Sequence, residues 1–336
     1  MSAGQVTIAD VAAAAGVSVA TVSKVINDRY GVAEHTSARV RMVIDELGYT
    51  SSLGAQSLRS RRSNVIAILA ADIEAFNAEL LKGAAQAIRV SGYDLVVFSD
   101  CGQREDQVGW ERRSLARVNA LTDGAILVTP SSVDVPSARP LVAVDHNARS
   151  STLPTVDSDN LSGAVSATEH LIGLGHRRIG FLAGRPDLES ARLRKQGYRR
   201  ALEAAGISFD PGLVRIGGYR ADTAEGAARE LLSLAPRPTA IFAANDTSAI
   251  ETIAVARSLG LTVPGDLSVV GFDNVPESAL CEPPLTTVDQ SVQRMGREAV
   301  QMLIRLIEDP SRAPEQVILP TRLVERGSCR PPAGTP

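Results

Sequence analysis

The first 48 residues repeat apolar side chains every three to four positions, the spacing of one face of an α-helix. Three such stripes follow one another, with the turn Gly16-Val17-Ser18 after the first and Gly48 after the third. The stripes are Ile8, Val11 and Ala12; Val22, Val25 and Ile26; and Val40, Val43, Ile44 and Leu47. Thr7, with Asp10 three residues on, and Ser18 are typical helix N-caps. The pattern predicts a three-helix unit with a sharp reversal at Gly16.

From residue 65 onward, short apolar runs alternate with amphipathic stretches. Runs of this kind are typical of strands buried on both faces, in parallel sheets covered by helices. The predicted strands are 65–69, 95–98, 125–128 and 141–144, and then 179–183, 213–216, 240–243 and 268–272. The predicted helices are 76–91, 105–120, 162–174, 190–205, 222–234, 247–259 and 291–307. Because the pattern begins again near residue 160, we expect two α/β lobes, with terminal strands at 317–319 and 323–324.

The second predicted helix has an outward face of short side chains and one cation. Short side chains let a helix approach DNA bases in the major groove, and a Lys can donate to guanine acceptors. We therefore predict that this helix reads DNA. An ordinary amphipathic helix pair would explain the two-helix pattern by itself. The outward residues are Val19, Ala20, Thr21, Ser23, Lys24 and Asn27.

The complete run from Thr7 to Asn27 reads T-I-x-D-V-A-x-x-A-G-V-S-x-x-T-V-S-x-V-I-N. It resembles the helix-turn-helix headpiece of the lactose-repressor/galactose-repressor family of transcription regulators. The resemblance implies a sequence-specific regulator, in the first place a repressor, that binds a palindromic operator in double-stranded DNA as a homodimer. The DNA-contacting residues that we predict in the headpiece are Thr7, Ser18, Val19, Ala20, Thr21, Ser23, Lys24 and Asn27.

Residues 49–62 contain Ser and Gly and few apolar side chains, as a flexible linker would. The family resemblance implies instead a hinge that becomes helical on the operator and wedges a Leu into the minor groove. Leu58 is the candidate wedge, and Arg59 is the candidate phosphate contact beside it, with Arg61 and Arg62 following. The family's usual Pro-Asn is replaced here by Ser51-Ser52.

Several polar residues fall where predicted strands end. Asp145, Asn245 and Asp273 close apolar runs, Gln290 follows a crossover, and Arg194 lies one turn into a helix. Because ligands of open α/β sheets bind beyond the carboxyl ends of the strands, we expect these residues at a cleft between the lobes. Asn245 could instead be only a helix N-cap, and Arg194 could pair with Glu189 or Glu203 on its own helix.

The stretches VDSDNLSGAVSATEHLIGLGHRRIGFLAG, FAANDTSAI and PPLTTVDQ resemble the same family's regulatory domain, which periplasmic sugar-binding proteins share. The resemblance implies that a small polar effector, a sugar or sugar derivative, binds in the cleft. The implied hydrogen-bonding residues are Asp145, Arg194, Asn245, Asp273 and Gln290, with Phe76 and Tyr219 stacking on the effector. Regulation by a phosphocarrier protein or a nucleobase-type corepressor is the alternative.

Two departures from the family pattern concern this cleft. The family's Asn-Pro-Phe-Phe after the first strand is here Glu74-Ala75-Phe76-Asn77, and its Asp-Arg after the fourth is Asp145-His146. One aromatic side chain is thereby lost and one cation is weakened. We expect a pocket more polar than a usual pentose or hexose site.

Length and composition indicate a protein of more than one domain without membrane segments. The chain of 336 residues exceeds the usual size of one core, and its net charge of −3 does not decide for or against nucleic acid. The N-terminus lacks a signal-peptide pattern, and no apolar run approaches the ~20 residues of a membrane helix. Cys101, Cys281 and Cys329 lie far apart, so we expect free thiols in a reducing compartment, the cytoplasm, and no membrane association.

Catalytic and metal-binding motifs are missing from the sequence. It contains no Gly-x-Ser-x-Gly elbow, P-loop or His-Glu-x-x-His, so we expect no enzymatic activity, no cofactor and no metal. His170 and His176 are spaced to lie on different sides of a helix, and His176 reads as part of a basic helix C-terminus.

The predicted architecture is α/β. A three-helix helix-turn-helix headpiece occupies residues 1–48 and a hinge 49–63. A two-lobed, periplasmic-binding-protein-like regulatory domain with two parallel sheets follows. Its first lobe combines 64–157 with 291–319, and its second lobe combines 158–290 with 320–330.

Overall fold

The computed structural model describes residues 6–26, 29–49, 62–100, 107–131, 137–146 and 153–332. The chain divides into two compact units, Met1–Ser63 and Asn64–Pro336. Each unit has its own hydrophobic core, and each is described by itself.

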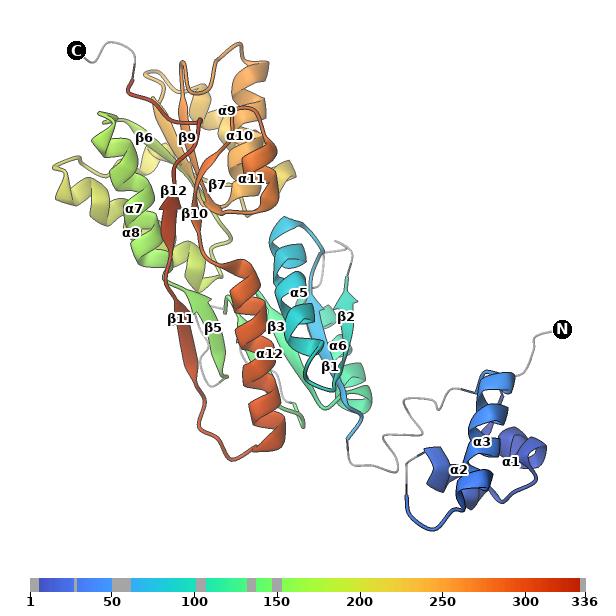
Figure 1. Ribbon diagram of the computed structural model, residues 1–336. Helices are drawn as coiled ribbons and strands as arrows, with labels where there is room; N and C mark the ends of the chain where they lie inside the picture. Colours follow the sequence, from blue (N-terminus) through green and yellow to red (C-terminus); the bar gives the residue numbers. More distant parts are fainter. Residues whose placement is uncertain are drawn as a thin grey trace. The chain divides into compact units, whose positions relative to one another are not determined.

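The N-terminal unit contains the helices α1 (Ile8–Ala15), α2 (Val19–Ile26) and α3 (Glu34–Leu47), as predicted (Figure 1). Thr7 and Asp10 form a capping box at the start of α1, in which the Thr7 N–H donates to Asp10 Oδ2 over 2.8 Å. Gly16 ends α1 with a φ of 64°, a left-handed conformation that a branched residue would resist. Val11, Val22 and Val40 form the fully buried centre of the core.

One predicted core residue of this unit is wrong. Leu47 is the last residue of α3 and remains 38% exposed, whereas Val40 and Val43 are buried and Ile44 is half-buried. Because Gly48 turns the chain immediately after Leu47, the last turn of α3 extends beyond the small core.

The first lobe of the larger unit is built on a six-stranded sheet in the order β11-β5-β4-β3-β1-β2. All its strand pairs are parallel. The strands are β1 (Val65–Ala70), β2 (Asp94–Ser99), β3 (Gly124–Val128), β4 (Leu141–Val144), β5 (Thr155–Ser158) and β11 (Gln316–Leu319). The helices are α5 (Ala75–Ile88), α6 (Gln107–Leu121) and α12 (Val292–Glu308).

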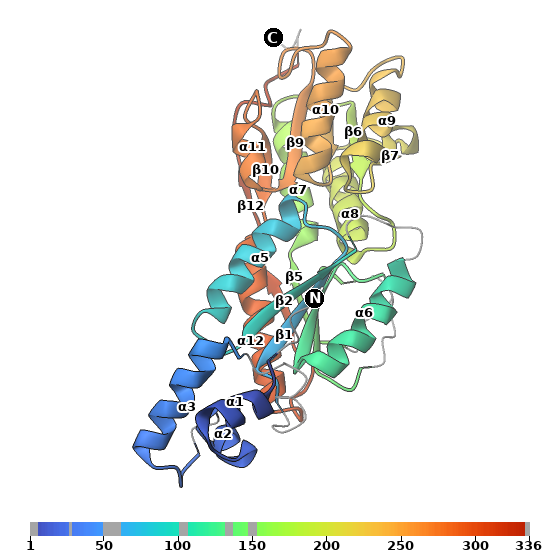
Figure 2. The same ribbon diagram turned by 90° about the vertical axis from the view of Figure 1, so that its right-hand side faces the viewer.

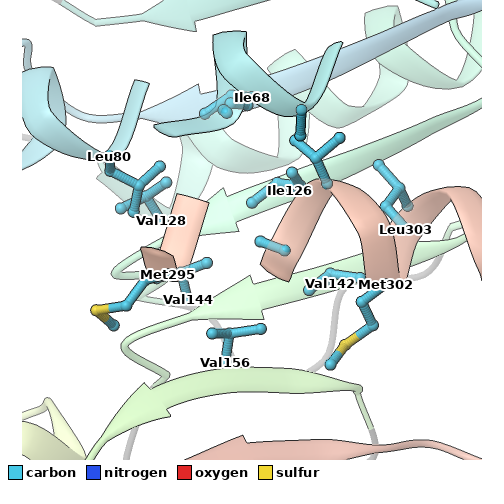
Figure 3. Packing of buried hydrophobic residues seen from close by; sticks show 14 of the residues in the cluster. Ile68, Leu80, Ile126, Val128, Val142, Val144, Val156, Met295, Met302 and Leu303 are labelled. Atoms are coloured by element: carbon cyan, nitrogen blue, oxygen red, sulfur yellow. The ribbon is translucent and has the colours of Figure 1, made fainter. Parts of the chain in front are cut away.

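Alternate residues of β1 point to opposite faces of this sheet. Ile66 and Ile68 pack against α5 and α12, whereas Ala67 and Leu69 pack against α6. Figure 3 shows the first of these cores, where Leu80 of α5 and Met295 and Leu303 of α12 meet the sheet. The predicted stripe of α12 is buried except Ile304, which is half-buried.

The second lobe is built on another six-stranded sheet, in the order β12-β10-β9-β8-β6-β7, and only its β10–β12 pair is antiparallel. Helices α7 and α8 cover one face, and α9 and α10 cover the other (Figure 2). The strands are β6 (Ile179–Ala183), β7 (Val214–Ile216), β8 (Ala240–Ala243), β9 (Ser268–Asp273), β10 (Thr286–Asp289) and β12 (Arg322–Val324). The helices are α7 (Asn160–Gly173), α8 (Glu189–Ala204), η2 (Pro211–Leu213), α9 (Ala221–Leu232), α10 (Asp246–Ser258) and α11 (Pro276–Leu280).

The chain passes between the two sheets after β5, after β10 and after β11. β5 and β10 are strands where the sequence suggested only connecting segments. β2 is an edge strand with half-exposed side chains, not the fully buried strand that its apolar run predicted. Leu213 ends a 3₁₀ turn, so the strand predicted to begin there begins at Val214.

His176 follows the C-terminal end of α7, as predicted, and its N–H donates to the Leu171 carbonyl over 3.1 Å. The cation expected there is wrong, because burial lowers the pKa of the His176 imidazole. Its ring is buried and bonds Thr239 Oγ1 over 2.9 Å and Ser268 Oγ over 3.0 Å, and it also contacts the Arg330 carbonyl. The imidazole therefore ties the C-terminal segment to the second sheet. Cys281 and Cys329 are free thiols, and Cys101 lies outside the described residues.

Among the residues that the structure describes, no single helix is both long and apolar enough to cross a membrane. Only α1 and α2 taken together are long and apolar enough, and the two helices are bent by 104° at the turn between them.

Candidate functional site

The exposed face of α2 is the first candidate site. Val19, Ala20 and Lys24 are exposed on it, and Thr21 and Ser23 are half-buried, while Val22 and Val25 face the core. The residues predicted to read bases thus lie opposite the buried stripe of the same helix.

The ends of this helix pair hold two further predicted DNA contacts. Ser18 Oγ accepts the Thr21 N–H over 3.1 Å, which caps α2, and Thr7 is exposed at the start of α1. Asn27, Leu58 and Arg59, also predicted to contact DNA, lie outside the described residues.

The second candidate site is a cleft between the two lobes of the larger unit. Its empty volume is about 620 Å³, including the part open to solvent. All seven residues predicted to contact an effector line it: Phe76, Asp145, Arg194, Tyr219, Asn245, Asp273 and Gln290. Further lining residues, which we did not predict as effector contacts, are Asp72, Glu74, Asn77, Thr129, Arg185, Leu188, Gly218, Arg220 and Thr247.

Arg194 is the centre of a buried polar network at the base of the cleft. Only 3% of the residue is exposed, and its guanidinium carbon lies 3.7 Å from the centroid of the Phe272 ring. Nε donates to Asn160 Oδ1 over 2.8 Å, and Nη1 donates to the Ala244 carbonyl. Nη2 donates to Gln290 Oε1 over 3.3 Å.

The alternative in which Arg194 pairs along its own helix is therefore wrong. Arg192 pairs with Glu189 instead, and Arg199 pairs with Glu203. Arg194 Nη1 lies 3.5 Å from Asp273 Oδ1 in the cleft. Arg192 and Arg194 are only two residues apart, but they lie on different sides of α8. Arg194 therefore points into the cleft, whereas Arg192 pairs with Glu189 at the surface.

Asp273 ends β9 with a φ of 119° and is buried. Gln290 Nε2 donates to its Oδ1 over 2.5 Å. Burial raises the pKa of Asp273 to about 7, although Arg194 opposes the shift. Burial also raises the pKa of Asp145, again opposed by Arg194. One guanidinium thus lies near two carboxyl groups that both lose hydration in the cleft.

Asn245 has the structural role that was the alternative to ligand binding. It caps α10, because its Oδ1 accepts the Ser248 N–H over 3.1 Å, and its Nδ2 donates to the Tyr219 carbonyl over 3.1 Å. Asn245 also lines the cleft, so one side chain orders the loop that carries Tyr219 and faces the cavity.

Tyr219 lies over Gly184 at the side of the cleft. A Cβ on Gly184 would come within 2.0 Å of the Tyr219 ring, so only glycine leaves room for this ring. The Tyr219 hydroxyl lies 3.2 Å from Ser190 Oγ, and burial raises the pKa of the phenol to about 12. Tyr219 therefore stays neutral, with an aromatic face suited to the apolar face of a ligand.

His146 stands where the family resemblance led us to expect Arg. Its Nδ1 lies 3.0 Å from both carboxylate oxygens of Asp157, on β5, and this interaction raises the pKa of His146. The His146 ring thus bonds a side chain of β5, and His146 is not among the residues that line the cleft. Among the described residues, no group of three or more His, Cys, Asp or Glu side chains could hold a metal ion.

Comparison with known proteins gives matches to both units of this chain. Residues 7–52 match the bacterial regulatory proteins of the lacI family, and residues 168–329 match the periplasmic binding protein-like domain. The HTH-type transcriptional regulator CelR of Thermobifida fusca is 34% identical, over 96% of this chain and 98% of its own length.

Two solved structures cover nearly the whole chain. The complex of the transcriptional regulator CelR with cellobiose has 33% identity and a TM-score of 0.73, covering 96% of this chain and 99% of that chain. The lac repressor dimer bound to operator and the anti-inducer ONPF has 27% identity and a TM-score of 0.81, covering 97% and 99%. With a full-length relative above 30% identity and matching domains at both ends, the chain belongs to the lacI family of bacterial regulatory proteins and is a helix-turn-helix, DNA-binding transcriptional regulator.

Proposed function

We propose that this regulator represses transcription in the cytoplasm by binding a palindromic operator as a homodimer, and that a sugar or sugar derivative in the cleft controls it. The relatives support this proposal: CelR has been solved with cellobiose, and the lac repressor has been solved as a dimer on operator. No cofactor or catalytic step enters the proposal.

The observation that carries the effector proposal is the Arg194–Asp273–Gln290 network, which is buried and yet lines the cleft. Carboxylate, amide and guanidinium groups at fixed positions suit a polyhydroxylated molecule, whose hydroxyls both donate and accept. Phe76 and Tyr219 add aromatic surface on the two lobes. A pocket with a few fixed polar groups and aromatic walls is typical of small-molecule sites.

On the DNA side, the exposed residues of α2 enter the major groove in this proposal. Lys24 donates to guanine, while Ala20 leaves room for close approach. The hinge at 49–63 becomes helical on the operator, with Leu58 as minor-groove wedge and Arg59 on phosphate, as the family resemblance implies. The proposed domain boundaries are those expected from the sequence: a headpiece at 1–48, the hinge at 49–63, a first lobe of 64–157 with 291–319, and a second lobe of 158–290 with 320–330.

In this proposal, the two lobes move relative to each other about the three segments of chain that connect the two sheets. An effector that prefers one arrangement of the lobes shifts the equilibrium between arrangements by its differential affinity, typically ~1–3 kcal/mol. In a dimer, that shift changes the spacing of the two headpieces and hence operator affinity.

The test begins with selection of a preferred operator from random duplexes using the full-length protein. Binding to that operator is then followed by fluorescence anisotropy with sugars, nucleosides, nucleobases and a phosphocarrier protein. A change caused by a sugar, accompanied by a higher melting temperature, supports the proposal. A response confined to a nucleobase or to the phosphocarrier would replace the sugar with that alternative.

A further inference from the structure

Asn77 has a feature that the network around Arg194 does not explain. It is the third residue of α5, only 7% exposed, and it lines the cleft from the first lobe. Its Nδ2 donates to the Asp72 carbonyl over 3.1 Å and to Asp72 Oδ1 over 2.7 Å. Rotating the amide by half a turn would point its oxygen at these two acceptors, so Asp72 fixes the orientation of Asn77.

In that orientation Asn77 Oδ1 is a buried acceptor to which no described residue donates. A buried polar atom without a partner destabilises a protein, and buried polar groups are nearly always hydrogen-bonded. Because Asn77 lines the cleft, a donor on a bound molecule could satisfy this oxygen. The side chain cannot turn its N–H groups to a ligand without breaking both bonds to Asp72.

The charges on this side of the cleft disfavour an anion. Asp72 and Glu74 line the cavity next to Asn77 and present carboxylates. Arg185 and Arg220 also line it, but each already pairs with its own carboxylate. Arg185 Nη2 lies 2.6 Å from Asp187 Oδ2, and Arg220 Nη2 lies 2.6 Å from Asp222 Oδ2.

The only other cation among the described lining residues is Arg194, which is held by the network at the base of the cleft. A phosphate or carboxylate would therefore meet carboxylates and an acceptor, and the two arginines beside it already have their charge offset by a paired carboxylate.

We propose that Asp72, Glu74 and Asn77 form a subsite that receives a hydroxyl or ammonium donor of the effector and rejects phosphorylated or carboxylated sugars. This inference rests on the proposed function, because it assumes that the effector binds in the cleft. It assigns to Asn77 a hydrogen-bonding role at the position where we expected only the loss of an aromatic side chain.

The experiment measures binding of matched sugars to the full-length protein by calorimetry and thermal shift. Each series holds one neutral sugar with amino, phosphate and carboxylate derivatives that keep its ring, for example glucose, glucosamine, glucose 6-phosphate and glucuronate. We expect the neutral or amino member to bind at least about tenfold more tightly than the anionic members, the ratio that one lost hydrogen bond produces.

The variant Asn77→Leu keeps the branched shape of the side chain and removes the acceptor. We expect about tenfold weaker binding of the preferred sugar and a smaller ratio between neutral and anionic sugars. Asn77→Ala serves the same purpose if the leucine variant does not fold. Asn119→Leu is the matched control, because Asn119 lies on α6, bonds Ser137 and does not line the cleft.

An anionic sugar that binds as tightly as its neutral parent would overturn the subsite, as would unchanged binding in both Asn77 variants. Either result leaves a sugar effector in place. If no sugar raises the melting temperature and operator binding responds only to a phosphocarrier protein, both the subsite and the proposed effector are rejected.

Discussion

Ser158 Oγ donates a hydrogen bond to Gln290 Oε1 over 2.7 Å, and both residues are buried. Ser158 ends β5 of the first sheet, and Gln290 follows β10 of the second, so the bond joins two passages of chain between the lobes. Gln290 in turn donates to Asp273 in the cleft. A ligand that changes the hydrogen bonding of Asp273 therefore acts directly on a segment that connects the lobes.

Ser158→Ala tests whether this bond transmits the effector signal. Loss of one buried hydrogen bond should reduce the free energy of unfolding by about 1 kcal/mol. The effector-induced change in operator affinity should decrease several-fold, because Gln290 loses its partner on the first lobe. Urea denaturation measures the stability, and fluorescence anisotropy with and without effector measures the response.

Thr168→Ala is the matched control for this prediction. Thr168 is fully buried, and its hydroxyl donates to the Ala164 carbonyl over 2.8 Å inside α7. It should lose similar stability and keep its effector response. If both variants lose the response to the same extent, the effect is one of stability and the Ser158–Gln290 bond has no special role.

Asp273→Asn tests the cleft network more cleanly than substitution of Arg194. Arg194→Ala would leave Asp273 buried without its cation, which typically costs about 3–5 kcal/mol and endangers the fold. An Asn at position 273 still offers an oxygen to Gln290. We expect Asp273→Asn to bind operator normally, while the effector-induced change in its operator affinity is at least tenfold smaller than in wild type. A full response, measured by the same anisotropy assay, would move the effector site away from Asp273.

The buried carboxyl of Asp273 also predicts a pH dependence of stability. Its pKa is raised from 3.8 to about 7 in the folded protein, so the folded state binds the proton more tightly. The resulting stabilisation is present below the unfolded pKa and is lost as pH rises through the folded pKa. The free energy of unfolding should fall, relative to that of Asp273→Asn, by on the order of 1 kcal/mol per pH unit between about pH 4 and 7.

Asp246, which interacts with Asp273 and also has a raised pKa, contributes with the same sign. The difference between the two proteins should level off above pH 7. Chemical denaturation across this range measures both curves. Parallel curves would mean that Asp273 titrates near its ordinary pKa and is better solvated than the structure indicates.

The elements that the sequence predicted well are those with a single strong pattern. The apolar runs of β1, β3 and β4 are buried on both faces of a sheet, and α12 buries its apolar stripe. β10 was missed because its threonines read as a polar crossover. Thr286 and Thr287 are nevertheless fully buried, and Thr287 bonds Asp246 on α10, a partner that no local pattern reveals.

The cleft was predictable only in part, for a similar reason. Polar residues directly after apolar strands, such as Asp145 and Asp273, were found because parallel strands end at one edge. Asn160 accepts from Arg194 across 34 positions of sequence, and Asn77 became interpretable only once its contact with Asp72 was known. The buried bonding of the His176 ring was not predicted, because its three partners come from distant segments.

The exposed face of α2 predicts which operator bases the protein reads. Lys24 is exposed in the last turn of this helix, opposite Val22 and Val25 of the core. If its ammonium donates to guanine, Lys24→Met should cost about 1–3 kcal/mol of operator affinity at one guanine of each half-site and relax the preference there. Selection from random duplexes followed by anisotropy measures both effects.

Lys195→Met removes another exposed lysine, on α8 of the other unit, and should change neither affinity nor preference. A uniform loss across all sequences, with a smaller salt dependence and the same preferred operator, would assign Lys24 to the phosphates. Exchanging Ala20 for a larger polar residue should then alter a different base position from Lys24, since the two lie one turn apart on the exposed face of α2. If both substitutions act at the same base pair, α2 does not lie in the groove in the orientation proposed.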